Sequence, residues 1–315
     1  MDIMGILVNV LLFASPLIIV AMGGLFSERS GVVNIGLEGL MIVGAFVTTA
    51  TSLILQDMGM SFLVSVLIGM VLAVIAGGLF SLIHAYASIS LRANQTISGV
   101  ALNMLALGVS LYLTQILFKA KETEPIGIGQ HASSFLIPGL GDIPVIGVFF
   151  DWRVILVAVV VVVTWYVMYR RPFGLRLRAC GEHPSAADSM GINVTKMRYQ
   201  AVIISGMLAG AGGALQMLAF AGKFAPYTIN GAGFMALAIL VFGQWRPFSV
   251  MTAGLFFGFL RVVGVTGSSL FPGLPIPEQV YFALPYIFVI IALILFSRNA
   301  TAPKALGVPY DKGLR

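Results

Sequence analysis

Apolar residues are grouped along the chain into long stretches separated by short polar segments. Nine such stretches cover residues 3–26, 36–55, 61–88, 97–118, 152–169, 199–222, 230–244, 248–265 and 279–297. A helix needs about 20 apolar residues to cross the roughly 30 Å hydrocarbon core of a membrane. Most stretches reach that length, so the pattern predicts an all-α polytopic membrane protein with about nine transmembrane helices. The stretch at 230–244 is short, and we expect a broken or partial span there.

The composition supports a membrane protein. Of the 315 residues, 59% are hydrophobic and 10% are charged, whereas soluble domains carry about 25% charged residues. No linker or charged block divides the chain, so we expect one transmembrane domain over residues 1–315. No basic residue precedes the first stretch, and we expect no cleavable signal peptide. The lone cysteine, Cys180, excludes an internal disulfide and is expected to be a small packing residue.

The basic residues predict the orientation of the chain. If the N-terminus lies outside, the inside segments hold 13 of the 18 basic residues. These are Arg29, Arg92, Arg170, Arg171, Arg176, Arg178, Lys196, Arg198, Arg246, Arg298, Lys304, Lys312 and Arg315. The positive-inside rule therefore predicts the N-terminus outside and the C-terminus inside. It also accounts for the net charge of +6 without nucleic acid as a partner.

Two segments of the chain resemble each other. Residues 36–46 (GLEGLMIVGAF) and 231–240 (GAGFMALAIL) are both rich in small residues, and each begins an apolar stretch. The predicted topology gives the two stretches opposite directions across the membrane. This is the expectation for an inverted repeat, with spans 1–4 mirrored by spans 6–9, and such transporters place their pathway at the repeat interface.

The sequence has no recognisable site for ATP hydrolysis and few candidates for an ion relay. It contains no G-x-x-x-x-G-K-[ST] loop. Deep ionisable candidates are limited to Glu38, His84 and Arg261. We expect His84 and Arg261 to reach the membrane surface from span ends. Glu38 is expected to pair with Arg29, to cap the start of the second span, or to line a pathway.

The polar segment 170–198 is the longest predicted inside loop. Pro184 suits the first turn of a short helix, and Gly191 suits its end. Ala187 and Met190 would then share an apolar face. Such a helix on the inside surface could be gripped by a groove on a partner, although an ordinary solvated loop is the alternative.

Several amides fall in or near the apolar stretches, where an unpaired amide is costly. These are Asn34, Asn94, Gln95, Asn103, Gln216 and Gln244. We expect Asn34 and Asn94 to cap helix breaks and Asn103 to face a polar substrate. The Gly206-x-x-x-Gly210 and Gly254-x-x-x-Gly258 spacings predict close helix packing.

Three motifs, in this order, resemble those of a known family. They are residues 28–41 (ERSGVVNIGLEGLM), residues 178–192 (RACGEHPSAADSMGI) and residues 233–238 (GFMALA). The chain is similar over nearly its whole length to permeases of ABC importers for branched-chain amino acids, ribose and nucleosides. The first motif and the length look most like the shorter of two permeases in bacterial nucleoside importers.

The resemblance implies a multi-pass permease subunit of the bacterial inner membrane that is not itself an enzyme. Its implied partners are a homologous second permease, an external substrate-binding lipoprotein and an ATPase with two cassettes that bind ATP and Mg. The implied coupling residues lie in the loop 170–198: Arg178, Gly181, Glu182, Pro184, Ala187, Met190 and Gly191. The candidate pathway residues are Asn34, Glu38, Met41, Asn103, Phe234 and Gln244.

The segment 119–151 is expected to be external and irregular, because it is rich in Gly and Pro. It includes residues 125–129 (PIGIG) and 137–141 (IPGLG), and it is a candidate docking surface for the binding protein. Two alternatives stay open. The chain could be an autonomous channel for small polar solutes, or a permease of the same type with a sugar or branched-chain amino acid as its substrate.

Overall fold

The computed structural model of the chain describes residues 3–137, 147–270, 277–296 and 302–311. Regular secondary structure in these residues is helical, apart from an isolated β-bridge between Leu136 and Asp151. The α-helices are α1 (Ile3–Arg29), α2 (Leu37–Asp57), α3 (Phe62–Ala85), α4 (Gln95–Phe118), α5 (Trp152–Arg170), α6 (Pro172–Glu182), α7 (Pro184–Ser189), α8 (Val194–Gln216), α9 (Ala232–Phe242), α10 (Pro247–Leu270) and α11 (Glu278–Phe296). Shorter π or 3-10 elements are η1 (Tyr86–Ser90), η2 (Ile128–Phe135), η3 (Gly147–Phe150) and η4 (Met217–Ala221).

Seven helices within the described residues are long and apolar enough to cross a membrane. They are α1, α2, α3 with η1, α4, α5, α8 with η4, and α10. These seven coincide with seven of the nine expected stretches. The short stretch contains α9, whose 11 residues extend only about 16 Å. This is too short to cross the hydrocarbon core of a membrane, as expected from the length of the stretch. The last stretch is α11, which is apolar over Gln279–Ile291.

Helix α8 lies at the centre of the bundle, against α1, α2 and α3. Its glycines permit this packing. A Cβ on Gly206 would collide with Gly77 and Ser81 of α3, and a Cβ on Gly213 would collide with the carbonyl of Met41 in α2. Close contact between backbones favours the association of helices in lipid. The close packing predicted from the Gly206-x-x-x-Gly210 spacing is therefore confirmed.

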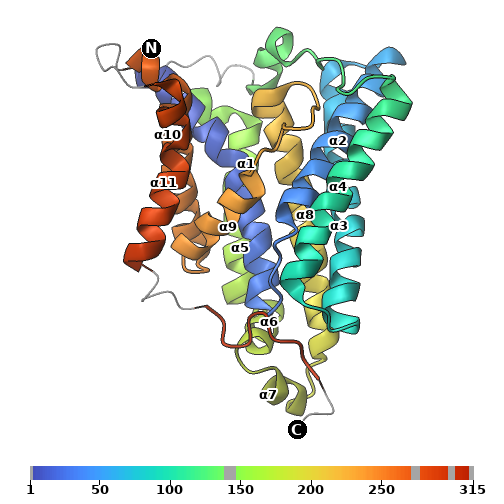
Figure 1. Ribbon diagram of the computed structural model, residues 1–315, viewed down its shortest axis with the longest axis vertical. Coiled ribbons are helices and arrows are strands. Elements are labelled where there is room, and N and C mark those ends of the chain that lie inside the picture. The colour runs from blue at the N-terminus through green and yellow to red at the C-terminus, as the bar shows by residue number, and fades with distance from the viewer. Residues whose placement is uncertain (1–2, 138–146, 271–276, 297–301, 312–315) are drawn as a thin grey trace.

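The two ends of the bundle differ (Figure 1). Helices α6 and α7 and the C-terminal residues 302–311 occupy one end, which we call the loop end. The N-terminus and residues 119–137 occupy the opposite end. Ion pairs and hydrogen bonds join separate segments at the loop end: Arg29 to Trp245, Arg92 to Asp311, and Arg198 to Val308. All six residues belong to segments predicted to lie inside (27–35, 89–96, 170–198, 245–247 and the tail after Ser297), and these contacts bring those segments together.

Two helix starts show how single amides set the boundaries. Asn94 accepts hydrogen bonds from the main-chain nitrogens of Thr96 and Ile97 and begins α4, as expected. Asn193 accepts from the main-chain nitrogen of Lys196 and begins α8 at residue 194. The expected start at residue 199 was wrong, because the apolar pattern does not include the polar first turn that this cap stabilises.

Candidate functional site

The first candidate site is a polar junction inside the bundle, where α2 begins. Residues 30–36 between α1 and α2 are not helical, and Gly36 at the start of α2 provides no side chain to cap it. Asn103 of α4 takes that role. Its Oδ1 accepts from the main-chain nitrogen of Gly39 at 2.7 Å, and its Nδ2 donates to the carbonyl of Ile35 at 3.0 Å. The amide expected to face substrate is thus engaged with backbone at the break.

Glu38 joins α2 to α9 at the same junction. One carboxylate oxygen accepts from the main-chain nitrogen of Gly231 at 2.7 Å, and the other accepts from that of Gly233 at 2.6 Å. Free N–H groups at a helix start carry partial positive charge, so a carboxylate is stabilised there. The expectation that Glu38 pairs with Arg29 or caps its own helix was wrong. The carboxylate caps α9, which lies far away in sequence.

The other candidate pathway residues are more scattered. Asn34 is fully buried, and its Nδ2 donates to the Ser205 hydroxyl of α8 at 2.9 Å. Met41 is fully buried against α8. Phe234 on α9 is half exposed, and Gln244 follows the far end of α9 with a φ of +49°. The junction therefore gathers Asn34, Glu38 and Asn103, while Met41 belongs to the core.

Two residues that sequence reasoning had not assigned to the junction hold residues 30–36 in place. His84 is fully buried and contacts the carbonyl of Val33 at 2.9 Å and the Ser98 hydroxyl at 3.0 Å. Gln95 accepts from the main-chain nitrogen of Val33 at 2.7 Å. The expectation that His84 reaches the membrane surface was wrong. A non-helical segment within an apolar bundle requires such partners, because its backbone groups cannot reach water.

The second candidate site is the loop 170–198, most of which is helical. Pro184 begins α7, and Gly191 follows it with a φ of +80°, as expected. Helix α6 was not expected, because its polar sequence lacks an apolar period. The shared apolar face was also wrong: Ala187 is 4% exposed, whereas Met190 is 83% exposed.

Helix α6 is anchored to the bundle at both ends. Near its start, a Cβ on Gly174 would overlap the backbone of α5 at Met168. Near its end, a Cβ on Gly181 would overlap the carbonyl of Arg29 in α1. The Arg29 guanidinium lies 3.8 Å from a carboxylate oxygen of Glu182. Buried Gly181 and the partly exposed Glu182 therefore hold the end of α6 against α1.

The C-terminal residues 302–311 cross the loop end beside α6. The main-chain nitrogen of Ala305 donates to the carbonyl of Gly181 at 2.9 Å, and that of Gly307 donates to the carbonyl of Gly31 at 3.1 Å. Arg198 of α8, which is 1% exposed, donates to the carbonyl of Val308 at 3.0 Å. This segment ties the loop 170–198 to the segment that precedes α2.

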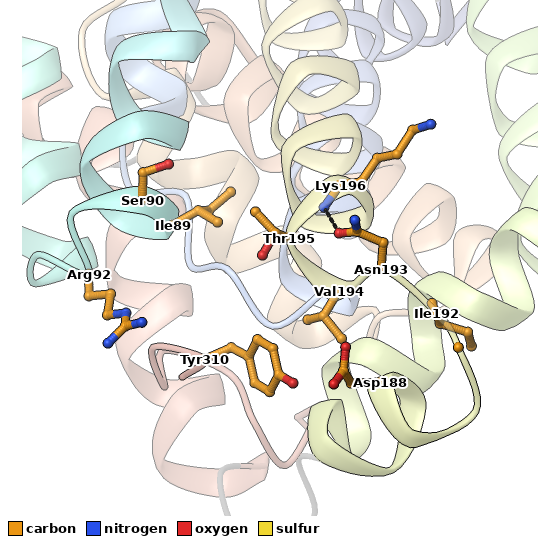
Figure 2. A pocket seen from close by; sticks show the side chains of 11 residues that line it. Ile89, Ser90, Arg92, Asp188, Ile192, Asn193, Val194, Thr195, Lys196 and Tyr310 are labelled. Carbon is orange, nitrogen blue, oxygen red and sulfur yellow. Dashed lines mark hydrogen bonds between the residues drawn. The ribbon is translucent and has the colours of Figure 1, made fainter. Parts of the chain in front are cut away.

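Two pockets flank the turn that joins α7 to α8. One has a volume of about 770 Å³, and Arg92, Asp188 and Tyr310 approach it from three separate segments (Figure 2). The other has a volume of about 740 Å³ and is lined by α6 residues, including Leu175 and Arg176, together with Met190. Leu175 and Met190 are 64% and 83% exposed. The second pocket is therefore an open groove that combines apolar and basic side chains.

Arg178 and Cys180 face away from that groove. The Arg178 guanidinium lies 4.7 Å from the centre of the Tyr169 ring and contacts the carbonyl of Gly174. Cys180 is fully buried, as expected for a packing residue. Burial raises the pKa of its thiol to about 11, although the nearby charge of Arg198 acts in the opposite direction. Its thiol is therefore protonated and unreactive near neutral pH.

Comparison with known proteins gives a family match over most of the chain. Residues 6–296 match the family described as branched-chain amino acid transport system / permease component. The chain is 49% identical to the guanosine ABC transporter permease protein NupQ of Bacillus subtilis, over 97% of this chain and 96% of that protein. It is 41% identical to the nucleoside ABC transporter permease protein NupC of Lactococcus lactis, over 98% and 96%.

A more distant relative is named for a different substrate. The chain is 37% identical to the putative glucose ABC transporter permease protein TsgC13 of Haloferax volcanii, over 82% of this chain and 76% of that protein. No solved structure matches the chain with significance.

Proposed function

The chain belongs to the family of branched-chain amino acid transport system permease components, and on this premise we propose that it is the permease subunit of an ATP-driven nucleoside importer. The similarity along nearly the whole chain to permeases named for guanosine and nucleosides carries the proposal. The seven apolar helices make the chain a multi-pass protein of the cell membrane.

Nucleosides are the substrates that the comparisons favour over sugars. The two relatives named for guanosine and nucleosides are matched over 96% of their length, whereas the relative named for glucose is matched over 76% and at lower identity. A nucleoside is largely neutral and needs aromatic contacts and hydrogen bonds. The half-exposed Phe234 on α9 can supply the aromatic contact.

The proposal assigns ATP hydrolysis to a separate subunit. The sequence lacks the phosphate-binding loop that ATP and Mg would require, and permeases of this family are membrane components. We assign ATP and Mg to a partner ATPase with two cassettes. A homologous second permease would complete the pathway, and an external lipoprotein would deliver the substrate.

The loop end is the surface proposed to meet the ATPase on the cytoplasmic side. The positive-inside rule supports this orientation. The groove with exposed Leu175 and Met190 beside Arg176 suits a partner surface that is apolar and acidic. In this proposal Pro184 and Gly191 shape the loop, whereas Gly181, Glu182 and Ala187 hold it against the bundle.

The proposed transport mechanism is alternating access between the two permeases. The start of α2 and the start of α9 meet at Glu38, and the two helices run in opposite directions from that point (Figure 1). This arrangement supports an inverted repeat. Because Glu38 and Asn103 are occupied by backbone groups, we assign substrate contact to side chains beside them, such as Phe234.

The opposite end is proposed to receive the substrate-binding protein. Residues 119–137 lie there (Figure 1). Of the motif at 137–141, residues 138–141 are outside the described residues. Deleting residues 126–141 should abolish stimulation of the ATPase by the binding protein and leave membrane insertion intact. Unchanged stimulation would exclude this surface.

A pull-down separates the importer from an autonomous channel. The tagged chain, extracted from its own membranes in gentle detergent, should recover an ATPase and a second permease. Deletion of the gene should abolish the uptake of labelled guanosine by cells. In wild-type cells, unlabelled nucleosides should compete with this uptake, whereas glucose and leucine should not. Recovery of the chain alone, with activity in liposomes, would favour the channel.

A substitution tests the docking surface. Met190→Arg places a charge where an apolar contact is proposed, so uptake should fall at least about tenfold while the ATPase stays active. Leu91→Arg is the matched control, because Leu91 is also exposed, at 62%, and lies outside the groove. Normal uptake by the Met190 variant would contradict the assignment.

A further inference from the structure

Helix α9 is flanked on both sides by consecutive residues with left-handed backbone. Asn230 and Gly231 precede it with φ of +43° and +82°, and Gln244 and Trp245 follow it with φ of +49° and +53°. Asn and Gly adopt this conformation readily, but Gln and Trp do not. Two adjacent strained residues persist only where their surroundings hold them. The contacts of Trp245 therefore show which residues hold this end of α9 in place.

Trp245 is held by the end of α1. Its indole nitrogen donates to a carboxylate oxygen of Glu28 at 2.6 Å, and its carbonyl accepts from Arg29 at 3.1 Å. Trp245 and Glu28 are 4% and 6% exposed. The other side of the Arg29 guanidinium faces Glu182, the last residue of α6. Arg29 thus lies between the loop 170–198 and the turn after α9.

The chain before α9 is tied to the opposite end of the bundle. The main-chain nitrogen of Thr123 donates to the carbonyl of Phe224, and the main-chain nitrogen of Phe224 donates to the Thr123 hydroxyl, both at 2.9 Å. The main-chain nitrogen of Ile126 donates to the carbonyl of Gly222 at 2.8 Å. The segment 222–231 therefore connects the proposed external surface to the Glu38 cap.

Helix α9 packs against the bundle over most of its surface, and Phe234 is its one exposed residue. Ala236 and Ile239 are fully buried toward the bundle, whereas Phe234 is 49% exposed. The helix is also short, at 11 residues. Because left-handed pairs at both ends can absorb changes of φ and ψ, α9 can shift as a unit without unfolding.

We propose that α9 moves as one rigid segment during transport, and that Glu28, Arg29 and Trp245 are the positioning residues that connect its movement to the loop 170–198. Displacement of α6 by the ATPase would act on Arg29 through Glu182. Arg29 and Glu28 would then release or reset the turn at Trp245, and the Glu38 cap would follow at the other end of α9. This inference rests on the proposed function.

The test removes the hydrogen bond of the Trp245 indole to Glu28 and keeps an aromatic side chain. In proteoliposomes holding the assembled transporter, Trp245→Phe should lower the number of nucleosides transported per ATP hydrolysed by about fivefold or more, the lower range of coupling between sites. Trp152→Phe is the matched control, because the indole nitrogen of Trp152 is buried without a hydrogen-bond partner. A purely structural role would lower transport and ATP hydrolysis together and leave their ratio unchanged.

A second pair of variants covers the case in which Trp245→Phe fails to assemble. Glu28→Gln keeps an oxygen that can accept from the Trp245 indole and should keep the transport ratio, whereas Glu28→Leu removes the acceptor and should lower the ratio. Equal ratios for the Gln and Leu variants, or an unchanged ratio for Trp245→Phe, would overturn the inference.

The proposed function and the role of α9 are contradicted by different results. If the assembled wild-type transporter takes up no nucleoside, the proposed function is wrong and the inference falls with it. If the wild type transports nucleosides and the Trp245→Phe and Glu28→Leu variants keep its ratio, the proposed function stands and only the role of α9 is rejected.

Discussion

At the scale of single residues, the buried polar side chains explain why a chain this apolar has a defined structure at its breaks. Glu38, His84, Gln95 and Asn103 each bind backbone groups that α-helical hydrogen bonding leaves free. In lipid an unsatisfied backbone group costs several kcal/mol. The polar residues that look functional in the sequence therefore also have a structural role, and substitutions must separate the two.

Glu38→Gln should destabilise the protein by about 1–3 kcal/mol, because the amide of glutamine would present a donor to one of the two glycine N–H groups and leave it unpaired. Thermal unfolding in detergent should show a lower midpoint. Glu124→Gln is the control, because Glu124 is exposed, and its free energy of unfolding should stay within about 0.5 kcal/mol of the wild type. A Glu38 variant as stable as the control would contradict the capping role.

Cys180 should resist maleimide at pH 7 in the folded protein and react fully after denaturation. Burial holds the pKa of the thiol at about 11, above its ordinary value of 9.0, so the folded state keeps the proton more tightly than the unfolded state. The contribution of this group to the free energy of unfolding should fall as the pH rises from about 9 through about 11. An added Ser185→Cys, at an exposed site, should label at pH 7. Rapid labelling of Cys180 itself would contradict its burial.

At the scale of helices, glycine spacing decides which pairs come into close contact. Helix α8 uses Gly206, Gly210 and Gly213 to approach α2 and α3 so closely that a Cβ would overlap their backbone. The sequence predicted close packing at Gly206 and Gly210, but it did not predict which helices they would contact. Partner choice depends on the arrangement of all the helices, and a single sequence does not record it.

Gly213→Ala should destabilise the protein by at least about 1 kcal/mol, because its Cβ would overlap the carbonyl of Met41 and force α2 and α8 apart. Gly108→Ala is the matched control. A Cβ there meets nothing within 4 Å, so the change should stabilise α4 by about 0.5–1 kcal/mol through helix propensity. Unfolding by SDS titration measures both, and equal effects would contradict the packing.

At the scale of the whole molecule, the C-terminal segment joins parts of the chain that are distant in sequence. Residues 302–311 bind the end of α6, the segment before α2 and the buried Arg198 of α8. The apolar pattern ends at residue 297 and assigns this segment no role. Its hydrogen bonds use mainly backbone groups, which leave no signature in the sequence.

Deleting residues 302–315 should destabilise the protein by about 2 kcal/mol or more, because Arg198 would lose its acceptor at Val308 while staying buried. Asp311→Asn removes the ion pair with Arg92, whose side chain is 50% exposed, and should cost less than about 1 kcal/mol. Thermal unfolding in detergent compares the two variants. If the truncated protein unfolds like the wild type, the segment is not part of the folded unit.

The sequence by itself determined the helical class, the positions of seven spans, the short seventh stretch and the motifs at residues 28–41 and 178–192. These properties follow from local hydrophobicity and local turn chemistry, which a linear pattern records. Only the tertiary structure decided that Glu38 caps α9, that Asn103 caps α2 and that Trp245 binds Glu28. Each of these bonds joins groups far apart in the chain, and the need to satisfy every polar group in lipid selects the partner only after the helices have packed.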